Sequence, residues 1–196
     1  MYHSYACGSI ISNPYSKFEL CSVGLTQETT CSPDGVPISV CMDGEYGYAI
    51  FRDNYIRKFN LVSGETIHSW AVPMNAPIHH QIAVISGRIY YCNVNNNEII
   101  IFPTSEESAL KVSVMSLGDV EKPAFIADNT KHHKETIIVG GAAGLGKYPI
   151  RHGFCEPKWF TRVEHARGIC VDDRGLIYVA RHNVPEITFH SQKTGS

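Results

Sequence analysis

The sequence lacks any apolar run near the roughly 20 residues that a membrane-spanning helix needs, and it lacks a basic excess. Its 17 Lys and Arg against 19 Asp and Glu leave a net charge of −2. Nucleic acids and anionic membranes attract proteins through a strong positive charge. We therefore expect neither a nucleic-acid partner nor membrane association. The 43% hydrophobic and 18% charged residues are typical of a folded globular protein.

The seven cysteines indicate neither a complete disulfide framework nor a zinc site. Seven is an odd number, and no Cys-x-x-Cys pair occurs. The sequence also has no Asn-x-Ser/Thr glycosylation site, and its start lacks the basic and apolar stretches of a signal peptide. These absences favour a cytoplasmic location, although a secreted protein that has lost its leader would look the same. Cys41, Cys92 and Cys170 fall on predicted strands, where we expect small buried side chains.

Helical periodicity is scarce, and a repeat of short alternating strands takes its place. Aligning Ile38, Ile82, Phe125 and Ile169 in four similar first strands gives steps of about 44 residues, which is typical of β-propeller blades. A second strand follows each first strand, and glycine-containing turns precede three of these second strands. Strands this short cannot bury both faces alone, so we expect blades stacked around an axis. The predicted fold is all-β, a small β-propeller of about four four-stranded blades.

The repeat divides a single predicted domain, residues 1–196, into four units, and the last unit is incomplete. The expected blades span residues 37–73, 78–118, 122–163 and 166–196. The last unit stops before its fourth strand, and residues 17–24 resemble the missing strand. Two explanations stay open. Either residues 17–24 complete the last blade and close the ring, which leaves no sheet edge unpaired, or the chain is a fragment of a larger propeller.

One unit carries a family signature. Residues 166–190 resemble an NHL repeat, with the pattern Gly168-Ile169-Cys170-Val171-Asp172, a glycine turn, Ile177-Tyr178-Val179-Ala180, and Phe189 ending the third strand. Arg181 stands where that family usually has Asp, and its Asn-Leu motif is absent. The resemblance implies a propeller with one face that binds protein or RNA, as in ubiquitin-ligase scaffolds, and it does not imply catalysis.

The expected binding face lies in the loops that follow the second strands, because those loops gather on one side of a propeller. Arg and Tyr are enriched at protein interfaces, which favours a protein or peptide partner and a non-enzymatic binding module or scaffold without a cofactor. The candidate residues are Arg52, Tyr55, Asn93, Asn95, Arg181 and His182.

The alternative is a metal-dependent propeller hydrolase or lyase. His80 and His165 precede first strands, at the entrance of a central channel, where imidazoles from successive blades could hold Zn²⁺. Asp43, Asp128 and Asp172 recur at one position of three units, where carboxylates could hold Ca²⁺ but ordinarily stabilise a turn. The sequence leaves the question of enzymatic activity open and favours its absence.

A glycine-rich segment comes close to a phosphate-binding loop. The spacing of Gly141, Gly146 and Lys147 matches that motif, but Tyr148 replaces the Ser or Thr that would bind Mg²⁺. Pro149 follows, and no helical pattern comes after it. A phosphate loop needs the oriented N–H groups of a helix start, so we expect an ordinary loop between strands.

Overall fold

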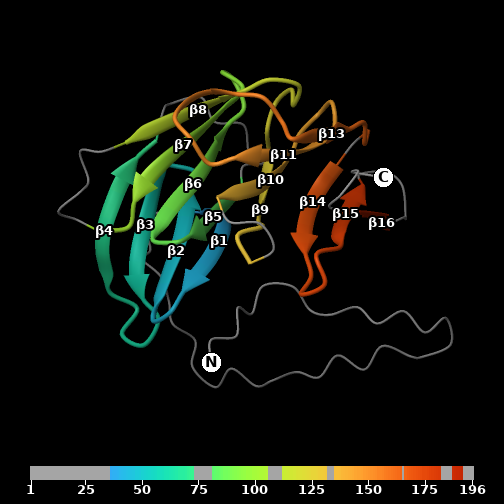
Figure 1. Ribbon diagram of the computed structural model, residues 1–196. Coiled ribbons are helices and arrows are strands. Elements are labelled where there is room, and N and C mark those ends of the chain that lie inside the picture. The colour runs from blue at the N-terminus through green and yellow to red at the C-terminus, as the bar shows by residue number, and fades with distance from the viewer. Residues whose placement is uncertain are drawn as a thin grey trace, which may run out of the picture.

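The computed structural model describes residues 36–72, 81–105, 112–131, 135–164, 166–181 and 187–191. In these ranges the chain forms four small sheets arranged as a four-bladed β-propeller (Figure 1). The predicted all-β propeller is therefore confirmed. The same ranges contain no helix long and apolar enough to cross a membrane.

With one exception in the second sheet, the sheets are built from strands in chain order, each antiparallel to its neighbours. The first sheet contains β1 (Pro37–Asp43), β2 (Tyr46–Phe51), β3 (Tyr55–Asn60) and β4 (Thr66–Ala71). The second contains β5 (Ile82–Ile85), β6 (Arg88–Asn93), β7 (Glu98–Pro103) and β8 (Ser113–Leu117). The third contains β9 (Phe125–Asp128), β10 (Thr136–Gly140), β11 (Leu145–Pro149) and β13 (Trp159–Thr161). The fourth contains β14 (Ala166–Val171), β15 (Ile177–Arg181) and β16 (Ile187–His190).

The first strands of the sheets lie next to one another: β1 contacts β5, β5 contacts β9, and β9 contacts β14. The turns that lead from first to second strands contain Gly44, Gly87 and Gly175, with φ of 61°, 70° and 83°. Glycine adopts this left-handed conformation without steric cost. Residues 17–24, which the sequence predicts to complete the last blade, lie outside the described residues.

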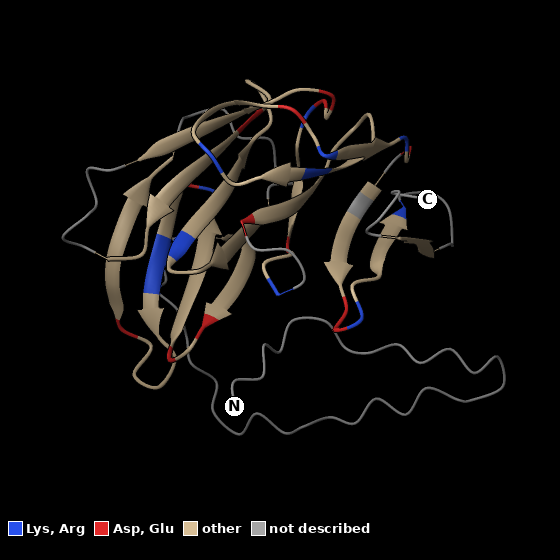
Figure 2. Ribbon diagram, viewed as in Figure 1, with Lys and Arg blue, Asp and Glu red and all other residues tan. Residues whose placement is uncertain are grey.

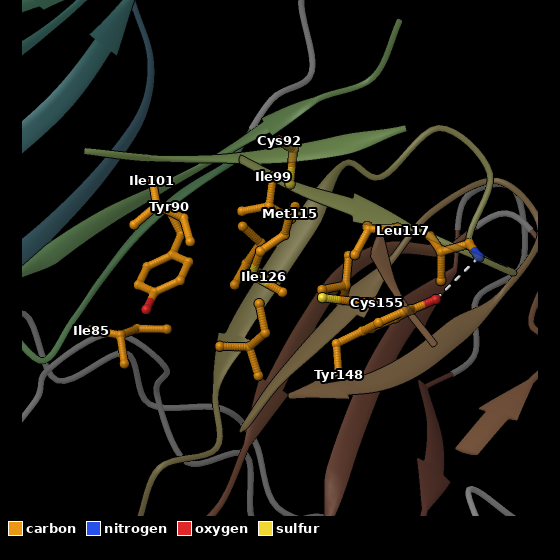
Figure 3. Close-up of a cluster of buried hydrophobic side chains, with 13 residues drawn as sticks. Ile85, Tyr90, Cys92, Ile99, Ile101, Met115, Leu117, Ile126, Tyr148 and Cys155 are labelled. Carbon is orange, nitrogen blue, oxygen red and sulfur yellow. Dashed lines mark hydrogen bonds between the residues drawn. The ribbon is translucent and has the colours of Figure 1, made fainter. Parts of the chain in front are cut away.

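The core consists of apolar layers between neighbouring sheets, because alternate residues of a strand point to opposite faces. In β2, Tyr48 and Ile50 pack against the second sheet, whereas Ala49 and Phe51 belong to a separate cluster on the other face. Figure 3 shows the layer between the second and third sheets, where Met115 of β8 and Tyr148 of β11 are fully buried. This burial stabilises the short sheets, and in the second and third sheets it reaches both faces.

One strand was not predicted. After β11 the chain forms β12 (Gly153–Cys155), which pairs in parallel with β8 of the second sheet, so this sheet has five strands. Cys155 is fully buried beside Leu117, and its carbonyl accepts a hydrogen bond from the Gly118 N–H at 3.2 Å. The third repeat thus covers the outer edge of the second blade, which would otherwise be unpaired.

Candidate binding surface

The second strands of the first and fourth blades end on one side of the molecule. In Figure 1, β1 and β14 both run toward the lower edge of the view, and their antiparallel partners β2 and β15 end at the upper side. Arg52 follows the end of β2, and Arg181 is the last residue of β15. The structure therefore places these two predicted residues on the same side of the propeller.

The loop between β2 and β3 is held by a set of short polar contacts. The Asp53 carboxylate forms an ion pair with the Arg57 guanidinium and accepts a hydrogen bond from the Tyr55 N–H at 3.2 Å. The Arg52 N–H donates to the Val36 carbonyl at 3.0 Å. Asn54 adopts a φ of 66°, which Asn tolerates better than most residues. The loop is thus tied to its own sheet on both sides.

Aromatic rings flank the same arginine. The Arg57 guanidinium carbon lies 4.4 Å from the centroid of the Phe51 ring and 5.7 Å from that of Tyr55, within the range of cation–π attraction. Tyr55 remains 42% exposed, and Arg52 is also exposed. The basic residues of β3 are visible in Figure 2 on the outer part of the first sheet. The loop therefore presents a positioned tyrosine and an arginine to solvent.

Exposed apolar side chains on β1 lie on the face of the first sheet that carries Arg57. Val40 pairs with Ala49, and Ala49 pairs with Arg57, so the three residues share a face of the sheet. Val40 is 64% exposed and Met42 is 50% exposed. We call Val40, Met42, Arg52, Tyr55 and Arg57 the first-blade surface. It combines apolar, aromatic and cationic groups on a backbone fixed by the sheet.

The second blade supplies one exposed predicted residue. Asn95 is exposed in the turn between β6 and β7. Asn93 is buried, and its side-chain amide donates to the Glu98 carboxylate at 3.3 Å across the base of that turn. Asn93 therefore stabilises the turn and does not reach the surface. His182, the remaining predicted residue of this face, lies outside the described residues.

Arg181 lines a pocket between the third and fourth sheets. The Arg181 Nε donates a hydrogen bond to the Glu164 carbonyl at 3.1 Å. The pocket has a volume of about 290 Å³, and its lining residues are Arg162, Val163, Glu164, Arg181, Thr188 and His190. Sequence reasoning found only Arg181. The others come from two further segments of the chain, and no local pattern links them.

The metal centre proposed at His80 and His165 stays a prediction. His80 and His165 lie outside the described residues, and the described ones contain no group of three His, Cys, Asp or Glu that could hold a metal ion. Asp172 instead accepts hydrogen bonds from the N–H groups of Arg174 and Leu176 and from the Tyr178 hydroxyl, at 2.8–3.0 Å. Although partial burial opposes it, these hydrogen bonds hold the Asp172 pKa below its usual value.

The glycine-rich segment is a hairpin between β10 and β11, as expected. The Gly141 N–H donates to the Gly144 carbonyl at 2.9 Å, and β11 follows in place of a helix. A Cβ atom on Gly144 would lie 2.3 Å from a backbone carbonyl of β13. Lys147 is only 4% exposed, and burial together with the neighbouring Lys158 lowers its pKa. The glycines thus allow close strand packing, and the segment has no phosphate-loop geometry.

The sequence matches no protein-family model and no curated protein. Solved structures are similar to it in fold. Hydrazine synthase of Kuenenia stuttgartiensis superposes with a TM-score of 0.66 at 14% identity, over 85% of this chain and 49% of that one. A functionally unknown protein from Desulfotomaculum acetoxidans superposes with a TM-score of 0.61 at 13% identity, over 81% of this chain and 53% of the other.

This chain therefore spans about half the length of the two similar structures. At such low identity the likeness concerns the propeller fold alone, because one fold hosts many unrelated functions.

Proposed function

We propose that the protein is a non-enzymatic binding module that recognises a protein or peptide through the second-to-third strand loops. The observation that carries the proposal is the first-blade surface, where Tyr55 is 42% exposed on a loop tied down by Asp53 and Arg57. Arg52 and Asn95 extend the contact surface in the first and second blades.

The chemistry of this surface fits a protein partner. Tyr, Met and Arg are enriched at the centres of protein interfaces, and exposed apolar side chains such as Val40 and Met42 gain free energy when a partner covers them. A loop that is already ordered loses little conformational entropy on binding. The net charge of −2 gives no comparable attraction for RNA.

The resemblance of residues 166–190 to an NHL repeat supports the same proposal. That family's propellers bind their partners through one face, and Arg181 lies on the side of the molecule where β2 ends. We propose on this basis that the chain is an NHL-like scaffold.

The test uses peptides selected from a random library on the immobilised protein, with affinities measured by calorimetry. Replacing Tyr55 or Arg52 by Ala should weaken binding by about tenfold or more, as expected for an interface hot spot. The matched control is Arg174→Ala, an exposed arginine in the turn between β14 and β15, at the opposite side. Peptides whose affinity is equal for the parent, Tyr55→Ala and Arg52→Ala proteins would contradict the proposal.

A further inference from the structure

The pocket between the third and fourth sheets is built from three separate segments. Arg162, Val163 and Glu164 belong to the link from β13 to β14, Arg181 ends β15, and Thr188 and His190 lie on β16. Residues two apart on a strand point to the same face, so Thr188 and His190 share one side of β16. Val163 is buried and packs in the apolar layer between the two sheets. One wall of the pocket is therefore apolar and buried, while Arg162 and Glu164 beside it are exposed.

The charges of the lining residues favour an anion. Among the described lining residues, Arg162 and Arg181 contribute two positive charges and Glu164 one negative charge, which leaves an excess of one positive charge. The Nε–H of Arg181 is held by the Glu164 carbonyl at 3.1 Å, which orients the guanidinium plane. The Thr188 hydroxyl lies 3.0 Å from Nε2 of His190. Two arginines, a threonine and a histidine thus line a single small pocket.

We propose that this pocket binds an oxyanion, the carboxylate or phosphate group of a small molecule or peptide. Guanidinium groups recognise such groups through paired, charge-assisted hydrogen bonds. The volume of about 290 Å³ lies at the lower end of the range for small-molecule pockets, so it suits one acidic group and its immediate neighbours. The proposal goes beyond protein recognition by the first-blade surface and does not depend on it.

The charge balance predicts opposite effects for two neighbouring substitutions. Arg162→Gln removes one of two positive charges, and the remaining charges of Arg181 and Glu164 cancel. Glu164→Gln removes the one negative charge among the described lining residues and leaves the backbone carbonyl that holds Arg181. We expect about tenfold weaker anion binding for Arg162→Gln and several-fold tighter binding for Glu164→Gln. Arg162 and Glu164 are both exposed, so neither change should disturb the fold.

The experiment is an NMR titration of the full chain with sodium phosphate and, separately, with sodium acetate, at constant ionic strength maintained with chloride. Resonances of Val163 and Thr188 report on the pocket, and circular dichroism checks the fold of each variant. Arg174→Gln is the control, because Arg174 is an exposed arginine outside the pocket. Saturable binding with Arg162→Gln weaker, Glu164→Gln tighter and Arg174→Gln unchanged supports the proposal.

The two anions distinguish the sources of the acidic group. Stronger binding of phosphate indicates a phosphorylated ligand, and stronger binding of acetate indicates a carboxylate. The proposal is overturned if neither anion produces saturable shifts at the pocket, or if Arg162→Gln binds both anions as tightly as the parent does. Equal responses to Arg162→Gln and Arg174→Gln would show only general screening and would also overturn it.

Discussion

Tyr148→Phe isolates one buried hydrogen bond in the layer between the second and third sheets. Tyr148 is 0% exposed, and its hydroxyl oxygen accepts a hydrogen bond from the Val120 N–H at 3.2 Å (Figure 3). The substitution keeps the ring and its packing but removes the acceptor. Val120 is itself fully buried, so its N–H would lose a partner where water has little access.

The expected cost follows from that loss. Leaving a buried donor unsatisfied costs about 1–3 kcal/mol. The 3.2 Å distance is at the long end of the normal range, so we expect a decrease of about 1–2 kcal/mol in the free energy of unfolding. For a chain of this size, that corresponds to a melting temperature lower by roughly 2–8 °C.

Urea unfolding followed by circular dichroism measures the effect, with the midpoint and the denaturant dependence fitted separately. The control is Tyr55→Phe, which removes a hydroxyl from a side chain that is 42% exposed and should change stability by less than about 0.5 kcal/mol. If Tyr148→Phe is as stable as Tyr55→Phe, with an unchanged denaturant dependence, the hydrogen bond does not stabilise this layer and the reasoning fails.

Three further predictions concern close packing, alkaline pH and thiol reactivity. Gly144→Ala should lower the free energy of unfolding by about 1–3 kcal/mol, because the new Cβ would lie 2.3 Å from a carbonyl oxygen of β13. Urea unfolding measures this effect. The control is Gly168→Ala, which should show a smaller effect because its Cβ would have its nearest neighbour at 4.0 Å. Burial raises the pKa of Tyr48 and Tyr148 from 10.0 to about 12. The folded state therefore holds these protons more tightly, and this stability is complete below pH 10 and lost as the pH rises toward 12. Because the chain has ten tyrosines, the check is a difference: the native Tyr148→Phe protein should show the same tyrosinate absorbance at pH 10 as the parent, and a lower absorbance would contradict the prediction. Burial also raises the pKa of the Cys92 thiol, which is 0% exposed, so a thiol reagent should modify Cys92 only in urea. Peptide mapping that finds Cys92 itself rapidly labelled in the native protein would refute this.

The alternation of apolar residues was enough to locate most strands. The third repeat looked irregular, yet the strand predicted at residues 147–150 is β11, Leu145–Pro149, displaced by two residues or fewer. In contrast, β12 contains three residues, too few for alternation to be visible, and its partner β8 is far away in the sequence. Its pairing depends on an open sheet edge that exists only after the second blade has formed.

The exposure of the predicted binding-face residues could also be predicted only in part from the sequence. The sequence placed Asn93 and Asn95 together after a second strand, but one is buried against Glu98 and the other is exposed. Asn93 is the last residue of β6 and pairs with Glu98, whereas Asn95 lies in the turn beyond the strand, where the regular alternation ends and exposure depends on the turn's own geometry. The role of Asp53 in positioning Arg57 also depends on the turn.

The sequence by itself determined that this chain is a β-propeller, because strand alternation, glycine turns and a period of about 44 residues are local properties that repeat along the chain. Only the tertiary structure decided which side chains meet. The pocket brings Arg162, Arg181 and His190 together from three segments, and the first-blade surface combines two strands with a loop. Such groupings depend on how blades pack against each other, and packing across distant segments leaves no pattern in the order of residues.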